Sequence, residues 1–258
     1  MTSRSAVRVI GRLDIKGPAV IKGFQMEGLR IVGEPGALAC ELYAAGADEL
    51  LYVDTVASLY DRDSICGILN ATARDVFVPL TVVGGVRTVD DARRLLRAGA
   101  DKVGINTAAL SRPQLLSEVA QTFGSQATVL SVEAKRHSKH GGWRAYTNGG
   151  RDDSGRDVLE WIEEALTHGV GEILVTSVDR DGTRHGLDSE LVEAVARITS
   201  VPLVVSGGAA APAVVAQVVA TNAIDGVAVG AALQRGTTTI AELKSALESV
   251  GCPVRRDP

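Results

Sequence analysis

The sequence predicts an α/β protein of the (β/α)8 barrel class, built from two homologous half-barrels. The 258 residues match the usual length of one such barrel. Short apolar, β-branched runs alternate with longer segments of helical period, which is typical of repeated βα units around a parallel sheet. Similar segments also recur at a nearly constant distance along the chain. We therefore expect one domain over residues 1–258, with half-barrels at about 1–123 and 124–258.

Eight short apolar runs are the expected strands. They are Val7–Ile15, Glu49–Asp54, Phe77–Val83, Lys102–Ile105, Thr128–Glu133, Glu172–Thr176, Leu203–Val205 and Gly226–Val229. Apolar residues make up 45% of the chain and aromatic residues only 3%, so the core must be largely aliphatic. Aliphatic side chains are the ones that line parallel strands buried on both faces. This composition favours a barrel over a β-sandwich.

The segments between these runs read as outer helices. Four of them place apolar residues at three- and four-residue spacing, as helices covering a sheet do: Val89–Ala98, Pro113–Thr122, Asp157–His168 and Ser189–Thr199. The most apolar stretch, Ala209–Ala220, contains Pro212 and Gln217 and is too short to span a bilayer. The basic amino terminus is not followed by an apolar segment, so we expect a soluble cytoplasmic protein.

An internal repeat relates the two halves. LDIKG (Leu13–Gly17) aligns with VEAKR (Val132–Arg136), and PLTVVGG (Pro79–Gly85) aligns with PLVVSGG (Pro202–Gly208). Across all matching segments the offsets run from 119 to 124 residues. Two half-barrels explain this value, because each would carry the same strand-end residues to opposite sides of the barrel mouth. A doubly wound sheet would predict no such symmetry.

Composition excludes several classes of function. The formal net charge of −4 disfavours binding to a nucleic-acid backbone, although a small phosphorylated ligand remains compatible with it. Neither the cysteines nor the histidines show the spacing of metal ligands, and we expect the histidines to be solvated: Cys40, Cys66, Cys252, His137, His140, His168 and His185. No metal, cofactor, nucleic acid or membrane partner is expected.

Two carboxylates, Asp14 and Glu133, close equivalent strands of the two halves. Active sites of (β/α)8 barrels lie at the carboxyl ends of the strands, so the pair faces the mouth. One carboxylate could then serve as acid and the other as base. Ion pairing with Lys16, Lys135 or a barrel arginine is the structural alternative, and the residues alone leave both interpretations open.

Paired glycines follow the third and seventh strands and suggest two phosphate sites. Gly84–Gly85 and Gly207–Gly208 could expose backbone N–H groups to an anion, or could simply form tight turns. Polar or small residues after neighbouring strands would complete the two sites: Asn106, Thr107, Asp181, Gly182 and Thr183. A ligand with a phosphate at each end is implied. One site could instead be vestigial, because Gly230 and Ala231 offer no hydroxyl group.

Four charged residues begin inner strands at the opposite, amino-terminal face. Two cations, Arg8 and Lys102, and two anions, Glu49 and Glu172, would meet there. Such a cluster could simply close the bottom of the barrel, or it could have a function.

Several segments resemble the cyclase subunit of imidazole glycerol phosphate synthase (HisF): LDIKG, KGFQMEGLR, GADEL, DKVGINTAA, TFGSQ, AKR and TSVDRDGT. The resemblance covers nearly the whole chain. The sugar-isomerising barrel of the histidine pathway shares the half-barrel repeat but lacks TFGSQ and SVDRDGT in this form. The resemblance implies a carbon–nitrogen lyase that takes ammonia from a glutaminase subunit (HisH type) docked on its amino-terminal face. It converts a phosphoribulosyl-formimino aminoimidazole carboxamide ribonucleotide to imidazole glycerol phosphate in histidine biosynthesis.

The resemblance also implies roles for individual residues. Asp14 and Glu133 stand at the positions of the acid–base pair, and Lys22 borders the ligand. The four-charge ring, Arg8, Glu49, Lys102 and Glu172, gates the passage of ammonia. One phosphate is bound by Gly85, Asn106 and Thr107, and the other by Asp181, Gly182, Gly208, Gly230 and Ala231.

The chain departs from the family at its ligand end. Glu133 stands where the family has aspartate, and its extra methylene moves the carboxylate by about an ångström. Val83 replaces the first glycine of a triple-glycine turn, and Ala231 replaces a serine. Arg12 replaces a small residue and shares the inner face of its strand with Asp14.

An unpaired charge inside the barrel would be costly, so we expect Arg12 to pair with Asp14 or Glu133. These changes leave two further functions open. The chain could be a paralogue that delivers ammonia to a different acceptor, a sugar or natural product, together with a third protein. A non-catalytic scaffold barrel is the third alternative.

Overall fold

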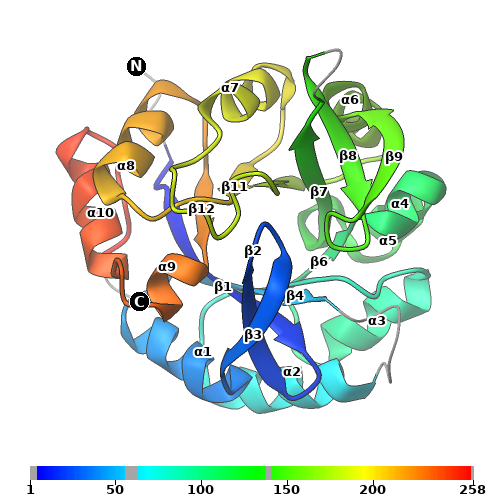
Figure 1. Cartoon of the computed structure of the whole chain (residues 1–258). Coiled ribbons are helices and arrows are strands. Elements are labelled where there is room, and N and C mark those ends of the chain that lie inside the picture. The colour runs from blue at the N-terminus through cyan, green and yellow to red at the C-terminus, as the bar shows by residue number, and fades with distance from the viewer. Residues whose placement is uncertain (1–4, 56–62, 138–140, 257–258) are drawn as a thin grey trace.

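The computed structural model describes residues 5–55, 63–137 and 141–256, which form a closed barrel of parallel strands surrounded by helices (Figure 1). Around the barrel the strands follow one another in the order β1, β4, β5, β6, β7, β10, β11 and β12, and β12 pairs with β1 to close the ring. Their bounds are β1 Arg8–Lys16, β4 Glu49–Asp54, β5 Leu80–Val83, β6 Lys102–Ile105, β7 Thr128–Arg136, β10 Glu172–Ser177, β11 Leu203–Ser206 and β12 Gly226–Val229. The predicted fold class is confirmed.

Helices cover the outside of the barrel. They are α1 Pro35–Ala44, α2 Asp63–Asp75, α3 Val89–Arg97, α4 Thr107–Ser111, α5 Gln114–Phe123, α6 Val158–Thr167, α7 Ser189–Ile198, α8 Pro212–Thr221, α9 Ala231–Gln234 and α10 Ile240–Ser249, with a 3-10 turn at Ser125–Ala127. The four helices predicted from periodicity are all present. Among the described helices, none combines the length and the apolarity that crossing a bilayer requires.

Two antiparallel hairpins extend the barrel at its carboxyl end. The first consists of β2 (Ala19–Phe24) and β3 (Glu27–Gly33) and continues from β1, where Asp14 pairs with Ile21. The second consists of β8 (Trp143–Thr147) and β9 (Asp152–Asp157) and continues from β7. Since β1 and β7 run in the same direction, both hairpins stand at the mouth (blue and green in Figure 1).

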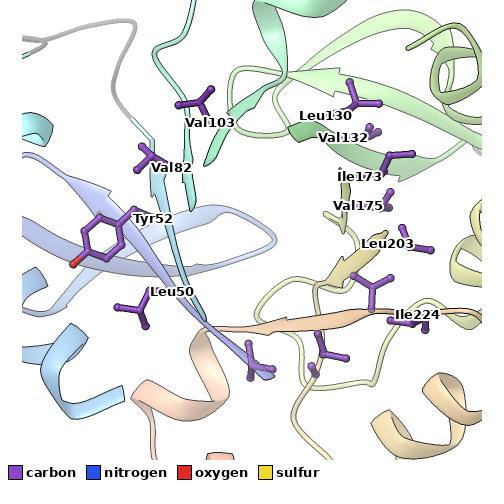
Figure 2. Close-up of a cluster of buried hydrophobic side chains, with 14 of the residues drawn as sticks. Leu50, Tyr52, Val82, Val103, Leu130, Val132, Ile173, Val175, Leu203 and Ile224 are labelled. Atoms are coloured by element: carbon purple, nitrogen blue, oxygen red, sulfur yellow. The ribbon is translucent and has the colours of Figure 1, made fainter. Parts of the chain in front are cut away.

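The apolar core has two parts because the side chains of each strand alternate between the two faces of the sheet. The larger part packs between strands and helices, and Figure 2 shows members from successive strands, among them Tyr52, Leu130 and Ile173. The smaller part fills the middle of the barrel: Ile10, Leu51, Val83, Val129, Leu174, Val204 and Ala228. This inner cluster separates the charged ring at the bottom from the polar mouth.

The third strand was predicted with a wrong start. We expected it to begin at Phe77, but β5 begins at Leu80, and Phe77 is 75% exposed. The ring of Phe77 lies edge-on to Tyr43, with 6.3 Å between their centroids. The predicted strand Phe77–Val83 therefore has two parts: Phe77 makes a contact at the surface, and Leu80–Val83 form the buried strand.

Candidate active site

Asp14 lies at the carboxyl end of β1 with both carboxylate oxygens bound by cations. Its Oδ1 accepts a hydrogen bond from Nε of Arg12 at 2.8 Å, and its Oδ2 accepts one from Nζ of Lys22 at 2.6 Å. Burial alone would raise the pKa of Asp14, but the two cations outweigh it and hold that pKa below its ordinary value. The predicted ion pair between Arg12 and a mouth carboxylate is confirmed, with Asp14 as the partner.

Arg12 crosses the barrel interior beneath the mouth. Its side chain leaves β1, and its Nη1 donates to Oγ of Ser206 on β11 at 3.0 Å and to Oγ1 of Thr176 on β10 at 3.4 Å. The residue is only 3% exposed. Burial would lower the pKa of Arg12, but Asp14 and other nearby carboxylates raise it above the ordinary value, so the guanidinium stays charged.

Glu133 lies at the mouth end of β7 in a different environment. Its Oε2 accepts a hydrogen bond from the backbone N–H of Gly150, in the β8–β9 turn, at 2.7 Å. Burial raises the pKa of Glu133, and the Gly150 N–H and the charge of Arg12 offset this only in part. Sequence reasoning missed Gly150. The sequence signal that could have found it is the Gly149–Gly150 pair. In the structure both of these glycines have positive φ.

Lys22 is buried at 4% exposure on β2, where it reaches Asp14 from the first hairpin. Its neighbour on the other side is Gly230, which directly follows β12. A Cβ atom on Gly230 would lie 2.3 Å from the Nζ of Lys22, so a side chain at that position would require the ammonium group of Lys22 to move. The mouth therefore gathers Asp14, Lys22 and Gly230 into one contact group.

A pocket of about 300 Å³ opens beside this group, between the ends of β10, β11 and β12. Its lining includes all five residues that the sequence assigned to one phosphate: Asp181, Gly182, Gly208, Gly230 and Ala231. Ser206 and Arg184 also line it and were not predicted. Gly208 has φ of 85°, and a Cβ there would lie 2.2 Å from the carbonyl oxygen of Gly186. This glycine is required for the turn whether or not an anion binds.

The second predicted phosphate site is divided. Gly85 lines a pocket of about 320 Å³ together with Asp54, Asp91 and Arg94, and neither Asn106 nor Thr107 belongs to that lining. These two residues contact the β8–β9 hairpin instead. Nδ2 of Asn106 donates to the carbonyl of Tyr146 at 3.2 Å, and Oγ1 of Thr107 accepts from the N–H of Asn148 at 3.3 Å. The other amide atom of Asn106, Oδ1, is buried without a partner among the described residues.

Arg8, Glu49, Lys102 and Glu172 form a closed ring at the amino-terminal face. Arg8 Nη1 lies 2.8 Å from oxygens of both Glu49 and Glu172. Lys102 Nζ lies 3.2 Å from Glu49 Oε2 and 3.0 Å from Glu172 Oε1. Each cation therefore contacts both anions. The structure brings together all four residues that the sequence placed there.

The described histidines lie away from this machinery. His168 ends α6, where its Nδ1 shares a hydrogen bond with Oγ of Ser117 at 2.8 Å. His185 is exposed and His137 is partly buried. His140 lies outside the described residues.

Comparison with known proteins relates nearly the whole chain to one family. A family model described as "Histidine biosynthesis protein" matches residues 8–239. Three relatives carry the name imidazole glycerol phosphate synthase subunit HisF. The relative from Legionella pneumophila is 55% identical over 204 residues, which are 79% of this chain and 96% of that protein. The relative from Streptococcus sanguinis is 44% identical over 248 residues, 96% of this chain and 98% of that protein.

The relative from Micrococcus luteus is 46% identical over 254 residues, which are 97% of this chain and 99% of that protein. The family model spans the barrel from the first residue of β1 to the residue before α10. The chain therefore belongs to the histidine biosynthesis family of barrels that includes the HisF subunits of imidazole glycerol phosphate synthase.

Proposed function

We propose that this chain is the cyclase subunit of a glutamine-dependent imidazole glycerol phosphate synthase. It uses ammonia to convert a phosphoribulosyl-formimino aminoimidazole carboxamide ribonucleotide to imidazole glycerol phosphate. One observation carries the proposal: two carboxyl groups at one mouth, the buried Asp14 and the partly buried Glu133, have pKa values displaced in opposite directions. Groups whose environments separate their pKa values in this way are suited to acid–base chemistry. The names of the relatives supply the reaction.

The proposed chemistry begins with ammonia forming an imine at the ketose carbon of the ligand. Ring closure and elimination then release imidazole glycerol phosphate and the aminoimidazole carboxamide ribonucleotide. Asp14 and Glu133 lie at the mouth, where the reacting carbon would be placed. The pocket at Gly208 and Gly230 suits one phosphate, because small residues leave room for the anion beside the backbone. Gly85, Asn106 and Thr107 remain our candidates for the other phosphate.

The partner in this proposal is a glutaminase subunit of the HisH type on the amino-terminal face. Three relatives are named as subunits of the synthase, which supports an assembly with a second chain. The ring of Arg8, Glu49, Lys102 and Glu172 stands at that face, and its side chains are only 8 to 14% exposed. We propose that this ring admits ammonia to the barrel interior.

A second function is favoured by the crossing of the interior by Arg12. The family has a small residue at position 12 and aspartate at position 133. The guanidinium of Arg12 under the mouth would therefore alter the path of ammonia, and Glu133 alters the acid–base pair. A paralogue that supplies ammonia for the amidation of a different acceptor, such as a sugar or natural product, would accommodate both changes. The acceptor would then be presented by a third protein.

The deciding experiment gives the purified chain ammonium salts and the ribonucleotide, without any glutaminase. We expect formation of imidazole glycerol phosphate, and loss of this activity in Asp14→Asn. Asp75→Asn, an exposed carboxylate at the end of α2, is the matched control and should retain activity. If the wild-type chain binds and activates a glutaminase but forms no product from the ribonucleotide, the first proposal is wrong and amidation of another acceptor replaces it.

A further inference from the structure

Both oxygens of Asp14 are engaged by side chains that are always or usually cationic. Arg12 takes Oδ1 and Lys22 takes Oδ2, and the two contacts come from different strands, β1 and β2. All three residues are buried, with exposures of 3 to 7%. Charge-assisted hydrogen bonds of this kind are about twice as strong as neutral ones. A proton on Asp14 would have to break one of the two contacts.

The guanidinium of Arg12 is fixed on the far side as well. Its Nη1 donates to Oγ of Ser206, and that hydroxyl in turn donates to the carbonyl of Ala228 at 3.0 Å, so Oγ is oriented to accept. The backbone carbonyl of Arg12 accepts a hydrogen bond from Nε2 of Gln234 at 2.9 Å. Arg12 is therefore anchored at its backbone by Gln234, and its guanidinium cannot rotate away from Asp14 without losing the hydrogen bonds to Ser206 and Thr176.

Glu133 has no such cationic partner in direct contact among the described residues. It accepts a hydrogen bond from the neutral backbone N–H of Gly150, and a hydrogen bond with the neutral side chain of Asn106 also acts to lower its pKa. The charged groups near this carboxyl are Arg12 and Asp14, and their electrostatic effects on it oppose each other. Around Arg12 the nearby carboxylates are Asp14, Asp181 and Glu133. The two carboxyl groups of the mouth therefore have different surroundings: Asp14 contacts two cations, whereas the partly buried Glu133 has only neutral hydrogen-bond partners among the described residues.

We propose that Arg12 is a positioning residue that fixes Asp14 as a permanent carboxylate holding Lys22, and that Glu133 is the carboxyl group of the pair that exchanges protons. The assignment of catalytic roles rests on the proposed function, whereas the difference between the two carboxyl groups does not. In each cycle Glu133 would give one proton to the ligand and recover one, with Asp14 unchanged in charge. Asp14 then acts by holding the ammonium group of Lys22 beside Gly230, at the edge of the pocket.

The test titrates the full chain, free of ligand and partner, labelled with ¹³C at the aspartate and glutamate side-chain carboxyl carbons. Asp14→Asn and Glu133→Gln assign the two resonances. In the wild-type chain we expect no titration step for Asp14 between about pH 5 and 8, and a Glu133 midpoint above the ordinary value for glutamate. A titration step of Asp14 within that range, or a Glu133 midpoint at or below the ordinary value, would overturn the proposal. This arm needs no variant that alters the clamp.

Arg12→Met keeps much of the bulk and removes the charge. We expect it to raise the midpoint of Asp14 by about one pH unit or more, whereas Arg12→Lys should keep that midpoint low. Arg197→Met, at the exposed end of α7, is the control and should leave it unchanged. Equal Asp14 midpoints in Arg12→Met and the wild-type chain would contradict the proposal. A purely structural role of Arg12 would not predict rescue by lysine.

The activity arm measures the pH profile of ammonium-supported product formation. We expect the acid limb of the profile to lie at higher pH in Arg12→Met than in the wild-type chain. In Arg12→Lys it should lie at the wild-type position. An unmoved profile in Arg12→Met would contradict the role of Arg12. Absence of product with the wild-type chain would reject the proposed function instead, and the carboxyl titration would then decide the placement of charge by itself.

Discussion

The ammonium group of Lys22 occupies the space that a side chain at position 230 would need. A Cβ atom on Gly230 would lie 2.3 Å from Nζ and 2.8 Å from Cε of Lys22, and 3.0 Å from the carbonyl oxygen of Arg12. Gly230 therefore does more than line the pocket. It lets a buried lysine from the first hairpin reach Asp14, and so brings β2 and the end of β12 together at one point of the mouth.

Gly230→Ala should displace Lys22 from Asp14. A displacement of about an ångström can reduce turnover by about 100-fold, so we expect a loss of this order in kcat/KM with ammonium. The matched control is Gly67→Ala in α2, where a Cβ meets no atom within 4 Å. That control should retain activity and gain up to about 1 kcal/mol of stability, because alanine favours a helix over glycine. A Gly230→Ala chain with wild-type kcat/KM would show that Lys22 is not needed there.

Removing one member of the Arg12–Asp14 pair should cost more than removing both charges. Asp14→Asn leaves Arg12 and Lys22 facing each other without their anion, and breaking a buried pair in this way costs about 3 to 5 kcal/mol. In a double-mutant cycle with Arg12→Met, urea unfolding should give a coupling free energy of about 0.5 to 3 kcal/mol. The exposed pair of Arg197 and Glu193 is the comparison, with an expected coupling of about 0.5 kcal/mol or less. Equal coupling free energies in the two cycles would show that the buried pair of Arg12 and Asp14 is no stronger than an exposed one.

The contributions of Glu133 and Asp14 to the free energy of unfolding should change with pH in opposite directions. The folded pKa of Glu133 is raised, so the folded state binds more protons than the unfolded state as pH rises from the unfolded pKa through the folded pKa. Over that window the wild-type chain loses stability, and Glu133→Gln does not. In urea unfolding at several pH values, the free energy of unfolding of Glu133→Gln should therefore rise relative to that of the wild-type chain as pH rises. A constant difference between the two chains would mean that the pKa of Glu133 is not raised.

Asp14 should stabilise the folded chain more at higher pH than at lower pH. Its folded pKa is lowered, so its stabilising effect is present above the unfolded pKa and is lost as pH falls through the folded pKa. The wild-type advantage over Asp14→Asn should thus be constant near neutral pH and shrink only in strong acid. The same unfolding series measures both residues. An advantage that already shrinks well above the unfolded pKa of aspartate would contradict the lowered value.

Lys102→Met should disturb the ring at the amino-terminal face. Glu49 and Glu172 would then share Arg8 alone, and we expect the free energy of unfolding to fall by about 3 kcal/mol. If the ring admits ammonia, glutamine-supported turnover with a bound glutaminase should fall more than ammonium-supported turnover. Arg112→Met, which breaks an exposed pair with Glu118, should cost less than about 1 kcal/mol. Equal loss of both activities would assign the ring to stability only.

The sequence predicted the barrel and the inward placement of Arg12 because both follow from the period of side chains along a strand. It did not predict the two hairpins at the mouth. Most residues of β3 are exposed, so its pairing with β2 depends on backbone hydrogen bonds, which leave no alternation in the side chains. Gly150 was missed for the same reason, because it binds Glu133 through its N–H group. Lys22 was expected near the ligand, but its contact with Asp14 depends on how the first hairpin folds back.

Closure of the barrel sets the time at which the mouth can form during synthesis. β1 precedes the other barrel strands, and its register on one side is supplied by β12, the last of them, where Arg8 pairs with Gly226. The oxygen that holds the tip of Arg12 comes from β11, and the glycine that admits Lys22 directly follows β12. A nascent chain still short of these strands would carry the first strand with one unpaired edge and with its buried charges open to water. The ribosome therefore has to release the chain beyond β12 and Gly230 before Asp14 acquires its final surroundings.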